Sequence, residues 1–261
     1  MSLMLRLRFL ALIFPLCSWL SMEVGLRLFQ SLHAEERAPT KYGSRAVRMH
    51  TDHSFFMKQP APDFWALLPY YVSQQTDADC SVSCATMTLN ALRAPRELRT
   101  DEELVTSELL FAKLGDQGQR WKKGVAAGGV GTSLEDFAQD LRLALPLFDL
   151  SQHQVDPVRF EKVTPESRSQ LIKLLTANEV QADDVVIANV LQSELTGDPE
   201  GAVGHLLPIA AFDATTARVL LLDPDRRWYE PYWVTVDTLL TALVTTDPQT
   251  HKNRGLLHIH K

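Results

Sequence analysis

The sequence is poor in cysteine and has no excess of basic residues. Only three of its 261 residues are cysteines, Cys17, Cys80 and Cys84. Three thiols exclude a disulfide framework, and they exclude a four-thiolate zinc site unless other ligands contribute. Lysine and arginine total 26 against 32 aspartates and glutamates, which gives a net charge of −6. This acidic balance argues against a nucleic-acid partner.

The sequence also lacks internal repeats and low-complexity tracts. Apolar residues make up 45% of it and charged residues 22%, a balance typical of globular proteins. These features exclude disorder and a collagen-like fold, and the length fits one domain, with or without a short appendage.

The N-terminus is typical of a targeting segment. Residues 1–8 carry two arginines and no acid, and the twelve residues of Phe9–Leu20 form an apolar run. Twelve residues are too few to span a bilayer core of about 30 Å, but they suit the apolar region of a secretory signal. Extension of the run to Phe29 would instead give an uncleaved anchor. We therefore expect residues 1–40 to be a signal peptide or a membrane anchor, preceding a domain over residues 41–261. A hydrophobic helix packed on that domain is the alternative.

Helical signals come first along this domain, after an irregular segment over residues 41–70. A partly buried helix is expected over Cys80–Arg93. The capping box Thr100–Glu103 predicts a helix that reaches Leu114. Two further helices are expected over Ser133–Leu143 and, with Thr164 as N-cap and Pro165 at the first position, to about Thr176.

Strand signals follow in the C-terminal half. The expected strands are Val185–Leu191, His205–Phe212, Arg218–Asp223, Trp233–Val236 and Leu256–His260, with a helix around Asp237–Leu243. The short turn 213–217 predicts a hairpin between the second and third of these strands. The fold class is therefore α+β, with a helical N-terminal half and an antiparallel sheet in the C-terminal half.

Four residues predict a cysteine nucleophile. Cys80 begins a predicted helix, whose free N–H groups and dipole favour a thiolate. Gln74 lies six residues earlier, where its amide could join the Cys80 N–H in an oxyanion hole. His205 begins one strand of the predicted hairpin and Asp223 ends the other, so the carboxylate can orient the imidazole. Each residue alone also has an ordinary structural explanation, and the prediction rests on their combination.

The two cysteines of this region also admit a metal or redox site. Cys80 and Cys84 share a helix face, but no further soft ligand is nearby in sequence. We therefore predict no metal site in the protein.

The order of cysteine, histidine and orienting carboxylate resembles papain-type enzymes, and over residues 60–260 the sequence resembles the phytochelatin synthase family in its short bacterial form. The resemblance rests on Gln74 with Cys80 and on five further stretches. They are Ala85–Leu92, Val186–Asn189, Gly204–Ala210, Leu221–Asp223 with Arg226, and the tail with Pro231, Trp233, Val234, Thr246, Asp247, Arg254 and Gly255.

This resemblance implies a papain-like fold with the nucleophile at a helix N-terminus. It implies that Cys80 is the nucleophile, His205 the base, Asp223 its orienting carboxylate and Gln74 the oxyanion glutamine. It also implies that a γ-glutamylcysteine pocket is lined by Asn189, Gly204, Asp247 and Arg254. Asp247 suits the free ammonium of a γ-glutamyl group, and Arg254 suits its free carboxylate.

The activity implied is that of a glutathione γ-glutamylcysteinyltransferase, in heavy-metal detoxification or glutathione turnover. The enzyme would cleave the Cys–Gly bond of glutathione through an acyl-enzyme and pass the acyl group to water or to a second glutathione, with hydrolysis favoured. No tightly bound cofactor is expected, and heavy metal such as cadmium or zinc would enter as a glutathione thiolate complex or as an activator. The implied location is the periplasmic side of a bacterial inner membrane, exported or anchored, and a homodimer is left open.

Departures from the family pattern, among them two next to the nucleophile, and motifs shared with another class keep other functions open. Ser81 stands where a glycine usually follows the nucleophile, and Cys84 replaces the usual serine or alanine. One alternative is a peptidase that trims bacteriocin leader peptides, since its Gln…Asp-Cys and His…Asp-Pro patterns are similar. The other alternative is an inactive protein that binds thiols or metal.

Overall fold

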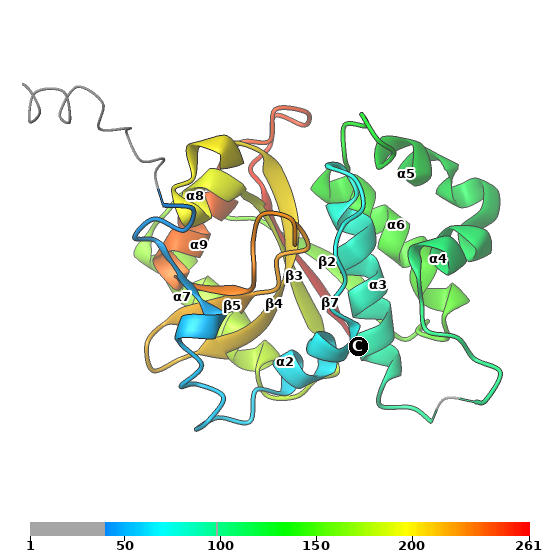
Figure 1. The fold of residues 1–261 in the computed structure, drawn as a ribbon, viewed down its shortest axis with the longest axis horizontal. Coiled ribbons are helices and arrows are strands. Elements are labelled where there is room, and N and C mark those ends of the chain that lie inside the picture. The colour runs from blue at the N-terminus through cyan, green and yellow to red at the C-terminus, as the bar shows by residue number, and fades with distance from the viewer. Residues whose placement is uncertain (1–39, 98) are drawn as a thin grey trace, which may run out of the picture. The chain divides into compact units, whose positions relative to one another are not determined.

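A seven-stranded, wholly antiparallel sheet forms the centre of the described part of the chain, in the order β1-β6-β5-β4-β3-β7-β2 (Figure 1). In this computed structural model, residues 40–97 and 99–261 are described, and Thr40–Lys261 form one compact unit. The strands are β1 (Ala46–Arg48), β2 (Gln154–Val158), β3 (Val185–Leu191), β4 (Gly204–Asp213), β5 (Arg218–Leu221), β6 (Tyr232–Thr235) and β7 (Gly255–His260).

The hairpin of β4 and β5 confirms the expected turn. The Asp213 carboxylate accepts the backbone N–H of Thr215 and the hydroxyl of Thr216, which closes the turn before β5. The pairing of Ile209 with Leu221 brings the start of β4 beside the end of β5. The chain geometry thus places His205 close to Asp223.

Five helices pack on one face of the sheet, four of them on the right of Figure 1 and α2 at its lower centre. They are α2 (Pro62–Leu67), α3 (Cys80–Arg93), α4 (Ser107–Leu114), α5 (Gln119–Gly124) and α6 (Leu134–Leu147). Every residue of α3 is buried, because the helix lies against β4 on one side and is covered by its neighbouring helices. The nucleophile predicted at its first residue is therefore held by a rigid core element.

Three helices cover the other face of the sheet, namely α7 (Pro165–Asn178), α8 (Gln192–Thr196) and α9 (Val236–Leu243). Alternate residues of β3 belong to the two cores: Ile187 faces the helices around α3, whereas Val186 and Ala188 face α7 and α9. This alternation follows from the period of two in a strand. Short 3₁₀ turns, Met49–Thr51, Leu68–Tyr70, Gly115–Gly118 and Pro199–Gly201, complete the described elements.

The expected antiparallel sheet is confirmed, but the division into a helical half and a sheet half is only partial. Strand β1 comes from the N-terminal half, and the helices α6, α7, α8 and α9 come from the C-terminal half. The segment 41–70, expected to be irregular, holds β1 and α2. Strand β1 has only three residues, too few to show alternation, and α2 begins directly at Pro62.

The helix expected from the capping box at Thr100 begins later, at Ser107. Glu103, the acid of the predicted box, lies outside any helix, and its neighbour Glu102 pairs with the Arg96 guanidinium at 2.6 Å and accepts the Arg99 backbone N–H at 2.8 Å. Thr106 caps the helix, because its side chain accepts the Leu109 N–H. The helices expected from Ser133 and Thr164 are confirmed with these residues as N-caps.

The predicted signal peptide or anchor lies outside the described residues, except for Thr40. None of the helices within residues 40–97 and 99–261 is both long and apolar enough to cross a membrane.

Candidate active site

Cys80 is the first residue of α3 and is 9% exposed. The first turn of a helix leaves its N–H groups without intrahelical partners, and its dipole favours negative charge there. The loop before it is held by Asp79, whose carboxylate accepts the backbone N–H groups of Gln75 and Thr76 at 3.0 Å. The Asp79 side chain therefore fixes the conformation of the loop that leads into Cys80.

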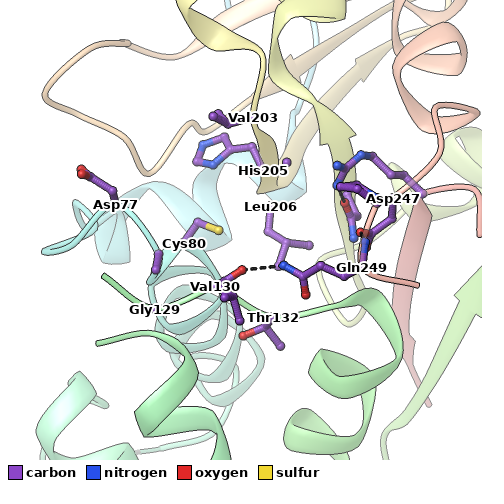
Figure 2. A pocket seen from close by; sticks show the side chains of 16 residues that line it. Asp77, Cys80, Gly129, Val130, Thr132, Val203, His205, Leu206, Asp247 and Gln249 are labelled. Carbon is purple, nitrogen blue, oxygen red and sulfur yellow. Dashed lines mark hydrogen bonds between the residues drawn. The ribbon is translucent and has the colours of Figure 1, made fainter. Parts of the chain in front are cut away.

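The imidazole of His205 lies against the carboxylate of Asp223. His205 Nε2 is 2.7 Å from Asp223 Oδ1, and the two side chains are 7% and 0% exposed. Burial disfavours the charged imidazole, but the charge and hydrogen bond of Asp223, with a smaller contribution from Cys80, raise the His205 pKa well above its ordinary value. Burial likewise opposes the charged carboxylate, yet His205 holds the pKa of Asp223 below its usual range. The two groups therefore form a buried ion pair (Figure 2 shows the Cys80 sulfur beside the His205 ring).

The second carboxylate oxygen of Asp223 is also engaged. Oδ2 accepts hydrogen bonds from Gln192 Nε2 at 2.9 Å and from the Tyr232 hydroxyl at 3.1 Å. The Tyr71 hydroxyl donates to the backbone carbonyl of Asp223. The sequence reasoning missed these three residues, although Gln192 directly follows a predicted strand whose last residue, Leu191, pairs with Gly204.

Gln74 lies on the loop that precedes α3 and is tied to the segment after Asp223. Its backbone N–H donates to the carbonyl of Pro224 at 2.8 Å. Its side-chain Oε1 is buried and has no hydrogen-bond partner within the described residues. The structure thus places Gln74 close to the pair of His205 and Asp223.

A cavity of about 250 Å³ opens at Cys80 and His205. Gly204 and Leu206, on β4 next to His205, line it together with the loop around Gly129–Thr132 and the loop after α9 (Figure 2). All four residues predicted for substrate binding also line this cavity: Asn189, Gly204, Asp247 and Arg254. The fold therefore brings these four residues together with the two reactive side chains.

The guanidinium of Arg254 is the central cation of this cavity. Its Nη1 donates to Asn189 Oδ1 at 3.0 Å, and the residue is only 6% exposed. Among the described residues no carboxylate lies within 4.0 Å of it. Burial lowers the Arg254 pKa, while the charges of Asp247 and Cys80 act in the opposite direction. The buried cation is thus left without a carboxylate partner of its own.

Gly204 makes room for this cation. A Cβ atom at position 204 would lie 2.5 Å from Arg254 Nη1 and 2.8 Å from Nη2, well inside van der Waals contact. Across the cavity, the Gln249 amide donates to the carbonyl of Val130 at 2.7 Å and joins two loops that line it (Figure 2). Sequence reasoning did not identify Gln249.

The two departures from the family pattern have structural explanations. The Ser81 hydroxyl accepts the indole N–H of Trp121 at 2.9 Å and lies 3.1 Å from the Thr132 hydroxyl. Cys84 is a free thiol with no exposed surface, and burial raises its pKa well above the ordinary value. Within the described residues, no group of three histidines, cysteines or acids could hold a metal ion.

Comparisons with known proteins identify the family of this chain. The sequence model of the family described as phytochelatin synthase matches residues 49–256. Glutathione gamma-glutamylcysteinyltransferase 3 of Lotus japonicus is 26% identical over 211 residues, which cover 76% of this chain and 37% of that protein. Glutathione gamma-glutamylcysteinyltransferase 2 of Arabidopsis thaliana is 24% identical over 207 residues, 76% of this chain and 40% of that protein. The chain spans about two fifths of the length of these relatives. Since the family match extends from before Cys80 to beyond Arg254, the chain belongs to the phytochelatin synthase family.

Proposed function

We propose that the protein is a glutathione γ-glutamylcysteinyltransferase with a papain-like catalytic arrangement. Cys80 is the nucleophile, His205 the proton carrier and Asp223 the carboxylate that orients it. The observation that carries the proposal is the buried Arg254 guanidinium, which has no carboxylate within 4.0 Å among the described residues and lines one cavity with Cys80. Such a cation is stable when a ligand supplies the missing carboxylate.

The cavity suits a γ-glutamyl group because this group carries a free carboxylate and a free ammonium. Arg254 would bind the carboxylate by a two-pronged hydrogen bond, and Asn189 holds the guanidinium in place. Asp247, which lines the same cavity, would bind the ammonium. A peptide with an ordinary α-linkage has no free pair of charges at this position, so the site favours γ-linked substrates.

The acyl-enzyme would form by attack of the Cys80 thiolate on the Cys–Gly carbonyl of glutathione. The oxyanion would be stabilised by the Cys80 backbone N–H at the start of α3 and by the Gln74 amide. His205 would donate its proton to the departing glycine nitrogen, and Asp223 would keep the imidazole oriented and balance its charge. Collapse of the intermediate breaks the C–N bond and leaves a γ-Glu-Cys thioester on Cys80.

Water or the amine of a second glutathione would then resolve the thioester. His205 would remove a proton from the attacking group, and Cys80 would leave as a thiolate. A heavy metal such as cadmium or zinc would enter as substrate, in a thiolate complex with glutathione. We propose no resident metal or cofactor.

Glycine release tests the proposal. The protein is incubated with glutathione, with and without Cd(II), and glycine and γ-Glu-Cys products are followed by mass spectrometry. Wild-type protein is expected to release glycine, and Cys80→Ala is expected to release none. Cys84→Ala is the matched control, because Cys84 is a core thiol with no exposed surface. Absence of glycine release in wild type, or full activity in Cys80→Ala, would overturn the proposal.

A further inference from the structure

The wall of the substrate cavity contains a polar group that the proposed mechanism does not use, the hydroxyl of Thr132. Thr132 carries the one side-chain hydroxyl among the described residues that line this cavity. In the view of Figure 2, Thr132 and His205 lie on opposite sides of Cys80. The Thr132 hydroxyl is also 3.1 Å from the hydroxyl of Ser81, the residue that follows Cys80 on α3. It therefore lies in the part of the cavity that holds the nucleophile.

The direction of the hydrogen bond between Ser81 and Thr132 follows from the surroundings of Ser81. Ser81 has no exposed surface, and its hydroxyl accepts the indole N–H of Trp121 at 2.9 Å. The proton of this hydroxyl needs an acceptor of its own, because a buried donor without a partner is costly. Within the described residues, the acceptor in hydrogen-bond range is the Thr132 oxygen. Ser81 thus donates to Thr132.

This direction leaves the proton of the Thr132 hydroxyl free to donate. A hydroxyl has one proton and two lone pairs, and Ser81 uses one of the lone pairs. Among the described residues, no acceptor for the Thr132 proton is found. Thr132 is half-buried and lines the cavity, so the proton is available to a bound ligand. The chain of hydrogen bonds from Trp121 through Ser81 thus presents an oriented donor at the cavity wall.

The backbone on both sides of Thr132 is held in place. The N–H of Gly131 donates to the Gly124 carbonyl at 3.0 Å. On the other side, Ser133 is the N-cap of α6, and its hydroxyl accepts the Asp136 N–H at 3.1 Å. The branched Cβ of threonine restricts rotation of the side chain further. The donor is therefore positioned before a ligand binds.

The γ-glutamylcysteinyl group carries one strong acceptor for which the proposed function assigns no donor. Arg254 would bind its free carboxylate, and Gln74 with the Cys80 N–H would bind the oxygen of the cleaved carbonyl. The oxygen of the γ-amide remains, since the cysteinyl sulfur is only a weak acceptor. Only the cysteinyl Cα and the amide nitrogen separate the γ-amide carbonyl from the carbon that Cys80 attacks. This carbonyl therefore comes close to the cavity wall beside Cys80, where Thr132 lies.

We propose that Thr132 is a specificity-determining residue, whose hydroxyl donates a hydrogen bond to the γ-amide carbonyl of the γ-glutamylcysteinyl group. The inference rests on the proposed function and adds to it a contact with the amide that links the two residues of the acyl group. The contact is the same in the bound substrate and in the transition state, because the γ-amide does not react. Its loss weakens binding and leaves the chemical step unchanged.

Replacement of the hydroxyl by a methyl group of similar size tests this contact. We expect Thr132→Val to raise KM for glutathione about ten-fold with kcat nearly unchanged, because the desolvated carbonyl loses its donor. Thr132→Ser keeps the hydroxyl and should stay within about two-fold of wild type in KM. Thr88→Val is the matched control, because the Thr88 hydroxyl is buried in α3 and has no hydrogen-bond partner within the described residues. An unchanged KM in Thr132→Val would overturn the inference.

The Ser81→Ala background separates a contact with substrate from a disturbance of the helix that carries Cys80. The Thr132 hydroxyl is retained in Ser81→Ala, so KM should change little. Addition of Thr132→Val to this background should again raise KM about ten-fold if the hydroxyl binds substrate. If Thr132 acts only through Ser81, the second substitution has no further effect and the inference fails.

Two ligands identify the acceptor and separate the inference from the proposed function. The analogue γ-glutamyl-2-aminobutyryl-glycine, which has a methyl group in place of the thiol, should show the same dependence on Thr132 as glutathione. A dependence that disappears with this analogue would assign the hydroxyl to the sulfur and contradict the inference. Calorimetry of γ-glutamylcysteine on Cys80→Ala should give about ten-fold weaker binding once Thr132→Val is added. This loss without any glycine release in wild type would refute the proposed function alone, whereas unchanged binding with normal glycine release would refute the inference alone.

Discussion

Gln192 Nε2 donates to Oδ2 of Asp223 at 2.9 Å, the carboxylate oxygen that does not contact His205. Tyr232 donates to the same oxygen, and the backbone N–H of Asp225 donates to Oδ1 at 2.9 Å. A fully buried carboxylate is thus stabilised in its charged form on both oxygens. The orientation of His205 depends on this network and not on Asp223 alone.

Removal of one donor should therefore shift the acid limit of activity. In Tyr232→Phe the hydrogen bond that helps to hold the Asp223 pKa low is lost, so this pKa should rise. The sign follows from the protonation state. A depressed carboxyl pKa keeps the ion pair intact down to low pH, and a higher pKa loses it sooner as the pH falls.

We expect Tyr232→Phe to move the acid limb of the kcat profile to higher pH and to reduce kcat about ten-fold, with KM nearly unchanged. The measurement is glycine release between pH 4 and pH 9. Tyr70→Phe is the control, because within the described residues the Tyr70 hydroxyl makes no hydrogen bond to this network and the side chain only packs against the core. An acid limb that does not move would show that Tyr232 has no part in the ionisation of Asp223.

The pair of His205 and Asp223 could be predicted because both residues lie on one hairpin of two consecutive strands. A short turn after Phe212 and two β-rich runs specify a hairpin, and a hairpin places the start of one strand beside the end of the next. Cys80 at a helix start was likewise visible from the helical pattern of Val82, Met87, Leu89 and Leu92. In both cases, nearby residues determine the arrangement.

The rest of the site depends on contacts between distant segments. Gln192 reaches Asp223 and Tyr232 across the sheet, and no local pattern marks it. The capping box Thr100–Glu103 does not start a helix, because contacts outside the box hold this segment: Glu102 pairs with Arg96, and the Glu103 carbonyl accepts a hydrogen bond from Arg93.

The spacing between Gly204 and Arg254 predicts a substrate-binding defect without loss of folding. In Gly204→Ala the new methyl group would lie 2.5 Å from Arg254 Nη1, so the guanidinium must shift. The clash falls on the far end of a flexible side chain, so the main effect is on the cavity. We expect KM for glutathione to rise about ten-fold with a change in Tm below about 3 °C.

A double-mutant cycle separates this effect from a general disturbance. Arg254→Ala alone should also raise KM, and Gly204→Ala added to Arg254→Ala should have little further effect, because the clashing group is gone. Additive increases in KM would show that Gly204 acts on the cavity independently of Arg254.

The Ser81 hydroxyl should contribute to stability more than to chemistry. In Ser81→Ala the indole N–H of Trp121, which is 1% exposed, loses its acceptor. A buried donor without a partner costs about 1–3 kcal/mol, which corresponds to a Tm lower by roughly 3–10 °C in a domain of this size. Thermal unfolding measures this, with Ser107→Ala, at the start of α4, as the control. Unchanged Tm would indicate that the N–H finds another acceptor.

Asp63 should make the protein less stable as the pH rises. Burial, followed by the charges of Glu179, Asp184 and Asp183, raises the pKa of this carboxyl from 3.8 to about 9, and the residue is 3% exposed. The folded state therefore holds a proton that the unfolded state releases near pH 4. Stability from this group is complete below pH 4 and is lost progressively up to about pH 9.

Asp63→Asn keeps an acceptor for the Asn178 amide, which donates to the Asp63 carboxylate, but it has no proton to lose. We therefore expect the variant to match wild type near pH 5 and to exceed its Tm by a margin that grows to roughly 10 °C at pH 9, because each pH unit in this range costs wild type up to about 1.4 kcal/mol. Thermal unfolding across this range, with the exposed Asp116→Asn as control, measures the difference. A difference in Tm that stays constant at every pH would mean that Asp63 is ionised in the folded protein. Only a group whose protonation changes on unfolding gives a difference in Tm that depends on pH.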